Sequence, residues 1–285
     1  MAYDIGRALP DDEVRLIELW SIVWSRKWHI IGISFAFAVL SLLYALLATE
    51  WYRAEVLLAP AEDRTTSPLQ GQLGGLAALA GVYIGAGDSV EAVATLKSRE
   101  FARDFIEGQG LLPVLFEDEW DPAGQHWLVD DPREQPDIRD AVRRFHEDIL
   151  RVDEDRATGL VTLAIEWTDP VLASEWASML VQRINSRLRE RALQEAEANV
   201  IYLQSEMAKT NVVTLQQAMG RLIESELNKL MLARGTQEFA FRTIDSAEPP
   251  DRRIRPKRAL IVVLGTLAGG LVALVWVFVG RALRP

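Results

Sequence analysis

Two long apolar runs, one near each end of the chain, most constrain what this sequence can fold into. Residues 30–48 and residues 259–279 contain no charged side chain. At about 1.5 Å of helical rise per residue, they would reach roughly 28 and 32 Å, close to the hydrocarbon thickness of a bilayer. The first run is too long for the core of a cleaved signal, and a long, partly acidic segment precedes it. We therefore expect two transmembrane helices, with residues 49–258 held on one side of the membrane.

Charge is distributed unevenly along the 285 residues, which carry 31 basic and 41 acidic side chains. The central segment is acidic except for a basic collar just before the second run, formed by Arg252, Arg253, Arg255, Lys257 and Arg258. An acidic body repels phosphate backbones, so we expect no nucleic-acid partner. The collar suits anionic lipid head groups, which makes membrane lipids an expected partner. Cysteine is absent, so no disulfide can form.

The flanking charges give two conflicting indications of orientation. Arg26 and Lys27 precede the first run, and the nearest base after it is Arg53. Because basic residues favour the cytoplasmic side, this places the N-terminus in the cytoplasm. The second run has more basic residues before it than after it and favours the opposite orientation. We follow the first run, which predicts cytoplasmic segments 1–29 and 280–285 and an exported segment 49–258.

Tryptophans recur every four residues just before the first run. Trp20, Trp24 and Trp28 share one face of an amphipathic helix expected over residues 14–28. At the head of a membrane span, this arrangement is typical of an aromatic belt at the lipid–water boundary. A docking surface for another membrane protein is the alternative.

The central segment has the pattern of a mixed α/β domain. A hairpin signal is clearest: two runs flank an acidic turn closed by Thr158 and Gly159. Helical rhythm predicts one helix over residues 89–107, ended by Gly108, and a second over residues 137–148. Irregular surface is expected between them, over residues 117–135. The expected strands are residues 52–58, 149–152, 160–167 and 238–244.

A helical pattern then runs from Pro170 almost unbroken to Arg234. Asp169 suits the N-cap and Pro170 the first helical position. Because the apolar stripe is narrow, we expect coiled-coil packing, with Leu180, Ile184 and Leu188 as packing residues. A bend at residues 209–213 would make a helical hairpin over residues 170–234. One continuous rod is the alternative.

Patterns that carry catalysis or cofactor binding fail on inspection. His29, His126 and His146 are scattered and have no metal-ligand partner at helical spacing. The glycine-rich segment 71–87 lacks the Gly-Lys-Ser/Thr ending of a nucleotide-binding loop, so we expect a buried or membrane-skimming loop. Asp153 and Asp155 are the one carboxylate pair suited to glycan hydrolysis, but acids at a turn are usually solvated. We expect no enzyme, no cofactor and no metal.

Small residues and prolines mark the second run and its approach. Gly265 and Gly269, with Gly270 beside them, are spaced for close packing against another helix, either the first span or a neighbouring protomer. Before them, a juxtamembrane strut that contains Lys257 is stiffened by proline, which fixes φ and lacks an N–H donor. The prolines of this strut are Pro249, Pro250 and Pro256.

Several segments, in order, resemble the Wzz-type chain length determinants of the polysaccharide co-polymerase family. They are residues 26–28, 54–60, 71–87, 159–170, 199–203, 238–250 and 255–270. The resemblance implies a bacterial inner-membrane protein with a periplasmic α/β base, a long helix rising from it and a homo-oligomeric ring. It also implies work with a polymerase of lipid-linked glycan repeat units. Some relatives couple to a tyrosine kinase, and this sequence departs from them, because the segment 280–285 carries no tyrosine and no phosphate-binding loop.

The sequence thus predicts an α+β membrane protein in which two terminal transmembrane helices flank a mixed base with a protruding coiled-coil hairpin. The expected function is non-enzymatic regulation of the chain length of O-antigen or another surface polysaccharide. A structural envelope tether or polysaccharide-export adaptor is the first alternative. A periplasmic carbohydrate-active enzyme using Asp153 and Asp155 is the second.

Overall fold

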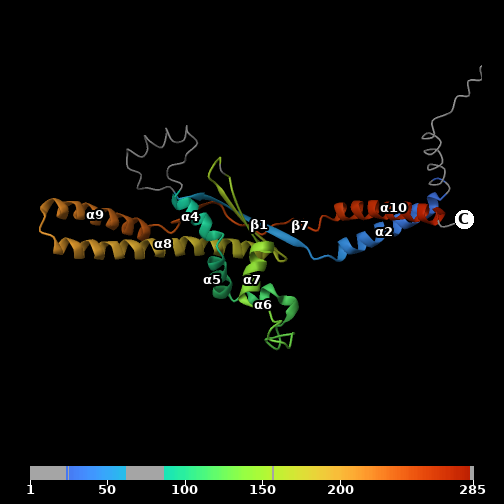
Figure 1. Cartoon of the computed structure of the whole chain (residues 1–285), viewed down its shortest axis with the longest axis horizontal. Helices are drawn as coiled ribbons and strands as arrows, with labels where there is room; N and C mark the ends of the chain where they lie inside the picture. The colour runs from blue at the N-terminus through green and yellow to red at the C-terminus, as the bar shows by residue number, and fades with distance from the viewer. Residues whose placement is uncertain (1–23, 25, 62–86, 156, 283–285) are drawn as a thin grey trace, which may run out of the picture. The chain divides into compact units, whose positions relative to one another are not determined.

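The computed structural model describes residue 24 and residues 26–61, 87–155 and 157–282. They belong to two units, one formed by residues 1–51 and 253–285 and the other by residues 52–252 (Figure 1). Most of the expected amphipathic helix at residues 14–28 lies outside the described residues. The same holds for the glycine-rich segment 71–87 except Gly87.

An antiparallel sheet forms the base of the second unit, with strand order β4-β5-β1-β6. In β5, Val161, Leu163 and Ile165 are fully buried, because alternate side chains of a strand face the same side. The expected hairpin is the pair β4–β5. The strand bounds are β1 (Trp51–Pro60), β4 (Leu150–Glu154), β5 (Val161–Trp167) and β6 (Phe241–Asp245).

The last strand begins three residues later than the sequence predicted. Residues 238–240 lie outside the strand, although the Ala240 carbonyl oxygen still accepts from the backbone N–H of Ala61 at 2.9 Å. The Glu238 carboxylate accepts from the backbone N–H of Thr243 at 3.1 Å, and the N–H of Ala240 donates to the side chain of Asn185 at 2.8 Å. The strand therefore starts at Phe241.

One helix was expected over residues 89–107, and this was wrong: two helices form, α4 (Gly87–Leu96) and α5 (Arg99–Gln109). The break is at Ser98, whose hydroxyl accepts from the backbone N–H of Phe101 at 3.1 Å and so caps α5. The end at Gly108 was also wrong. Gly110 ends α5 instead, with φ of 61° in the left-handed region that glycine adopts freely.

The second expected helix begins with a capping box at Asp137 and is α7 (Ile138–Arg144), followed by a π-helical turn, η2 (Phe145–Ile149). Residues 117–135 are largely irregular, as expected, and include a short hairpin in which the Trp120 and Trp127 rings meet edge to face at 4.9 Å. The short elements here are α6 (Leu112–Leu115), η1 (Glu117–Glu119), β2 (Trp120–Asp121) and β3 (His126–Trp127).

The core of the base is formed by buried side chains of the sheet, of α5 and η2, and of α8. Phe105 of α5 and Phe145 of η2 meet with ring centroids 5.8 Å apart, and both side chains are buried. On β5, Trp167 contacts Trp176 of α8 at 5.1 Å. Each large apolar side chain buried in this way contributes about 1.5–3 kcal/mol.

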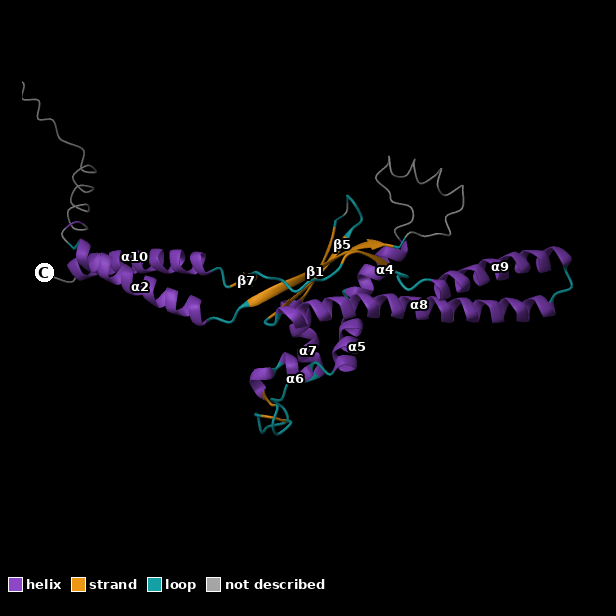
Figure 2. Ribbon diagram, turned by 180° about the vertical axis from the view of Figure 1, so that it is seen from behind, coloured by secondary structure: helices purple, strands orange, loops and turns teal. Residues whose placement is uncertain are grey.

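The long helical pattern forms a hairpin of α8 (Pro170–Lys209) and α9 (Val213–Gly235), so the bend is confirmed and the continuous rod is wrong. Asp169 accepts from the backbone N–H groups of Val171 and Leu172, and Pro170 occupies the first turn. Forty residues of α-helix make α8 about 60 Å long. Figure 2 shows α9 running back along the distal part of α8, beyond the strands of the sheet.

The first unit contains α2 (Lys27–Leu47) and α10 (Arg258–Ala282), with a short strand, β7 (Arg253–Arg255), before α10. Both helices are long and apolar enough to cross a membrane. Only 6% of the most apolar window of α2 and 17% of that of α10 are buried, unlike the core helix of a soluble protein. The two expected apolar helices are therefore present.

Candidate functional site

The glycines of α10 lie where α2 comes closest. A Cβ on Gly265 would lie 2.6 Å from the Cβ of Ser41, and a Cβ on Gly269 would lie 2.5 Å from the Cβ of Phe37. Both distances are shorter than atoms of packed side chains tolerate, so these two positions require glycine. Gly270 differs, because a Cβ there would lie an ordinary 3.5 Å from Ser34 Oγ. Of the two partners left open by the sequence, the structure has the first apolar helix of the same chain.

Small residues of α2 complete this contact, and sequence reasoning missed them. Ser34, Ser41 and Ala45 follow one face of α2, and Ala45 is fully buried. Ser41 donates its hydroxyl to the carbonyl oxygen of Phe37, so this polar hydrogen is paired within α2. On α10, Gly265 and Gly269 are followed, four residues after Gly269, by Ala273, which is also fully buried. The four-residue spacing of Ser41 and Ala45 in the first run was the sequence signal that could have predicted this contact.

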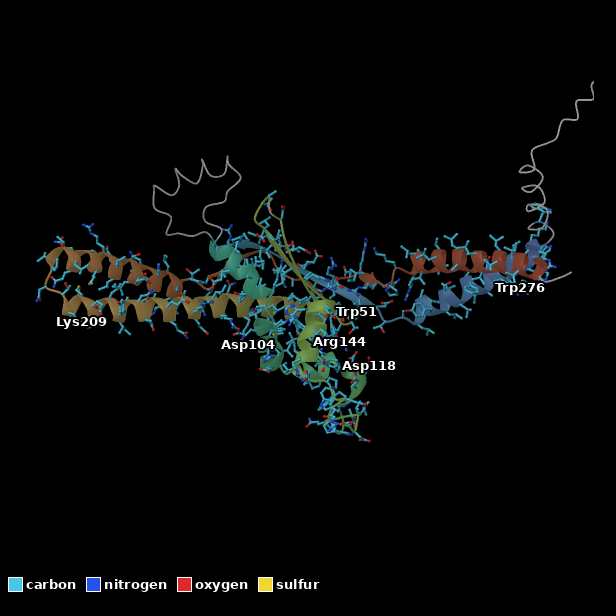
Figure 3. All side chains as sticks on the ribbon, viewed as in Figure 1. Trp51, Asp104, Asp118, Arg144, Lys209 and Trp276 are labelled. Carbon is cyan, nitrogen blue, oxygen red and sulfur yellow. The ribbon has the colours of Figure 1, made fainter. Side chains whose placement is uncertain are left out.

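The helices pair antiparallel. Near the start of α2 and the end of α10, the His29 and Trp276 rings lie 6.2 Å apart; Figure 3 labels Trp276. At the other end, Glu50 accepts from Arg253 at 2.7 Å and from Arg258 at 2.9 Å. Arg258 also donates from Nε to the carbonyl oxygen of Ala45 at 3.0 Å. Because this carbonyl belongs to the last turn of α2, Arg258 joins the C-terminal end of one helix to the N-terminal end of the other.

Arg255 stacks its guanidinium 5.2 Å above the ring of Trp51, which Figure 3 labels. Lys257 is exposed between Pro256 and the first turn of α10. Pro249 and Pro250 lie in residues 246–250, which form neither helix nor strand. Their stiffening role stays a prediction.

The three predicted helix-packing residues lie on the part of α8 nearest the sheet. Leu180 and Ile184 are fully buried, while Leu188 is half-buried. Arg234, near the end of α9, pairs with Glu197 of α8 at 3.0 Å, so α9 covers α8 from about that residue onward. Leu180 and Ile184 come earlier on α8 and are buried in the base. In the hairpin itself, the buried side chains are Ala196, Leu230 and Ala233.

Asn185 joins α8 to the last strand and was not found from the sequence. Its side-chain oxygen accepts from the N–H groups of Ala240 and Phe241 at 2.8 Å each, and its amide donates to the carbonyl oxygen of Phe241 at 3.0 Å. One buried side chain thus supplies three backbone hydrogen bonds to the edge of the sheet. In sequence, Asn185 is one polar residue among many on α8, and no local signal distinguishes it.

Charged contacts fix the shorter helices on α8. Arg187 pairs with Glu100 at 2.5 Å and with Asp104, which Figure 3 labels on α5. Arg191 pairs with Glu91 of α4 at 2.8 Å. These side chains are partly exposed, and such pairs contribute less than about 1 kcal/mol each. Their role is to orient α4 and α5 on α8 rather than to supply chemistry.

Of the two carboxylates considered for catalysis, Asp155 has structural partners. Asp155 accepts from the N–H of Ala157 at 2.9 Å and from the hydroxyl of Thr158 at 2.8 Å. These bonds, the backbone bond first, lower the pKa of Asp155, which is the opposite of what a general acid needs. Among the described residues, no group of three or more acidic, histidine or cysteine side chains could hold a metal ion.

Comparison with known protein families gives two matches, each over part of the chain. The model of the family described as "Chain length determinant protein" (Wzz) matches residues 12–108. Residues 12–108 are therefore similar to a Wzz chain length determinant domain. A second model, described as "G-rich domain on putative tyrosine kinase", matches residues 208–282. The Wzz match contains α2, β1 and α4, and the second match contains α9, β6 and α10. The resemblance expected from the sequence is therefore confirmed.

Solved structures similar to this chain include a "full-length bacterial polysaccharide co-polymerase". It is 15% identical, with 94% of this chain and 98% of that chain covered and a TM-score of 0.42. A fragment of WzzB, a polysaccharide co-polymerase from Salmonella Typhimurium, is 11% identical, with 73% and 100% covered and a TM-score of 0.30. Among curated proteins, none matches this chain.

Proposed function

We propose that this chain is a non-enzymatic regulator of surface-polysaccharide chain length, acting as a homo-oligomeric co-polymerase in the bacterial inner membrane. Its partners would be a polymerase of lipid-linked repeat units and the lipid-linked glycan itself, with O-antigen of lipopolysaccharide as the first polymer to test. The observation that carries the proposal is the Wzz match over residues 12–108, which includes the first apolar helix and the central strand of the base.

The arrangement of the described residues supports a role without catalysis. A sheet and its helices form a rigid base, and an α8–α9 hairpin extends from it. Asp155 is engaged in turn contacts. A long helical hairpin on this base suits a protein that contacts partners.

For the topology, we propose that α2 and α10 cross the inner membrane, that both termini are cytoplasmic and that residues 49–258 are periplasmic. Arg26 and Lys27 before α2 support this orientation, because cytoplasmic flanks are enriched in basic residues. The antiparallel pairing of α2 and α10 supports two crossings that start and end on the same side. No kinase partner is proposed.

The test is to delete the gene and resolve the surface polysaccharides of the cells by size on a gel. A regulator predicts that a clustered length distribution becomes a broad, short-biased one and that the cloned gene restores the cluster. Unchanged size distributions for every polysaccharide the cell makes would remove the proposal.

A structural tether or export adaptor is the second candidate. Apolar side chains on the outside of the hairpin favour it, since Ile201 and Val213 are 68% and 63% exposed and suit contact with another protein. This candidate predicts unchanged polysaccharide lengths in the deletion strain but a lost secreted product. Analysis of the culture medium beside the gel therefore separates the two.

A further inference from the structure

Positive charge is in large excess at the end of the α2–α10 pair where Glu50 lies. Arg253, Arg255, Lys257 and Arg258 are four of the five collar residues, and Glu50 is the one acid among the described residues of this unit. Asp251 and Arg252, just before them in sequence, offset each other. Glu50 holds Arg253 and Arg258, so three positive charges remain in excess at this end.

The collar lies at the boundary between polar and apolar sequence. Arg258 is the first residue of α10, and the helix continues with an uncharged run to Val279. Trp51, on which Arg255 stacks, has an amphipathic ring that prefers the lipid–water boundary. The first turn of α10 adds the positive end of its helix dipole. All three features place positive charge at the depth where lipid phosphates lie.

On the exported side of the membrane, these charges oppose the usual bias of basic residues toward the cytoplasm. The collar therefore needs a compensating interaction that an ordinary loop lacks. A protein partner would have to reach the membrane surface beside both helices, whereas lipid surrounds them on all sides. Anionic lipid supplies the matching charge without any further component.

We infer that the collar binds the phosphate of an anionic phospholipid through its net positive charge, to which Arg253, Arg255, Lys257 and Arg258 all contribute. The inference rests on the proposed crossing of the membrane by α2 and α10. Its consequence is that the end of the helix pair is anchored at a fixed depth in the leaflet.

The experiment reconstitutes the full-length protein in phosphatidylcholine vesicles with a trace of spin-labelled phosphatidylglycerol or spin-labelled phosphatidylcholine. Electron spin resonance then gives the relative association of each labelled lipid with the protein. One basic side chain at an anionic surface changes affinity on the order of fivefold, so we expect the wild type to prefer phosphatidylglycerol by roughly fivefold or more. The Arg255→Gln, Lys257→Gln double variant should bring the two lipids close to equal association.

Lys97→Gln with Arg221→Gln is the matched control, because both side chains are exposed and far from the helix pair in sequence. It removes the same charge and should keep the preference. Equal association of both lipids with the wild type, or an undiminished preference in the double variant, overturns the inference. Loss of the wild-type preference on adding millimolar inorganic phosphate also overturns it, since the site would then hold a free ion.

A separate measurement tests whether α2 and α10 cross the membrane. If alkaline carbonate extracts the wild-type protein from vesicles, α2 and α10 do not cross the membrane, and the topology and the inference fall together. A retained lipid preference with unchanged polysaccharide lengths in the deletion strain removes the proposed function and leaves the lipid site standing.

Discussion

Glu166 and Arg53 lie directly opposite each other on β5 and β1, with Arg53 Nε 2.9 Å from the Glu166 carboxylate. The side chain of Glu166 is 1% exposed, whereas that of Arg53 is 39% exposed. A carboxylate buried to this extent needs a cation or several hydrogen bonds. The pair therefore fixes the register of the central strands more than it adds to net stability.

Replacing Arg53 with Met should destabilise the base by about 2 kcal/mol, because the buried Glu166 carboxylate loses this cation. Breaking a fully buried ion pair costs about 3–5 kcal/mol, and the loss expected here is smaller because Arg53 is partly solvated. Thermal unfolding in detergent measures it. Arg242→Met, which removes an exposed arginine from β6, is the control and should change little. An equal loss of stability in both variants would contradict the role of Arg53 as the cation of the buried Glu166.

Replacing Asn185 with Leu should cost roughly 3 kcal/mol, because the backbone groups of Ala240 and Phe241 lose their partners in a buried place. Asn199→Leu is the matched control, since Asn199 is exposed on the same helix. Chemical unfolding of both variants with the wild type gives the comparison. If the two variants are equally stable, Asn185 does not hold the last strand.

Gly265→Ala and Gly269→Ala should each separate α2 and α10 slightly and destabilise the pair by about 1–3 kcal/mol. Gly32→Ala should be tolerated, because a Cβ at Gly32 meets nothing within 4 Å. The absence of native cysteine allows a direct readout of this separation. Ser34→Cys with Gly270→Cys should form an intramolecular disulfide, because a Cβ at Gly270 would lie 3.5 Å from Ser34 Oγ.

The glycine substitutions should slow formation of that disulfide, whereas Gly32→Ala should leave its rate unchanged. Non-reducing electrophoresis distinguishes the intramolecular bond, which shifts monomer mobility, from a crosslinked dimer. A dimer as the main product would assign the glycine contact to neighbouring protomers instead of one chain.

Acid should weaken the start of α7. Asp137 bonds to the Arg139 side chain at 2.7 Å and to the N–H of Asp140 at 3.1 Å, and these bonds lower its pKa from 3.8 to about 2. The unfolded chain then binds more protons, so this stabilisation is present above about pH 4 and is lost as pH falls toward 2. Asp137→Asn, which keeps a capping oxygen without the charge, should be less stable than wild type at neutral pH.

The two proteins should converge at low pH in thermal unfolding measured across that range. Asp130→Asn is the control, an exposed aspartate in the irregular segment, and should follow the wild type throughout. A constant gap between wild type and Asp137→Asn at all pH values would contradict the assignment.

Local signals were sufficient where one residue and its neighbours decide the structure. Asp169 followed by Pro170 predicted the start of α8, because the cap needs only the first free N–H groups. The apolar runs predicted α2 and α10 for the same reason. Ser98 was missed because the helical rhythm continues across it, and a serine inside an apolar pattern gives no sign that its hydroxyl will cap a new helix.

Long-range partners were beyond the sequence. The spacing of Gly265 and Gly269 predicted close packing, but it could not choose between α2 and a neighbouring chain. Glu166 has the sequence position of a solvated strand residue, and the register that places it opposite Arg53 is not visible in the sequence. Leu180 and Ile184 were expected in a coiled coil. Because the end of α9 lies beside Glu197, α9 does not reach these two residues, and they pack in the base instead.

The size distribution of surface polysaccharide tests the central proposal most directly. The measurement compares a deletion strain, the same strain with the wild-type gene and the same strain with an empty vector, each resolved on one gel. A chain-length regulator should give a cluster of preferred lengths with the gene and a broad, short-biased distribution without it. Identical distributions in all three strains, for every polysaccharide the cell makes, would contradict it.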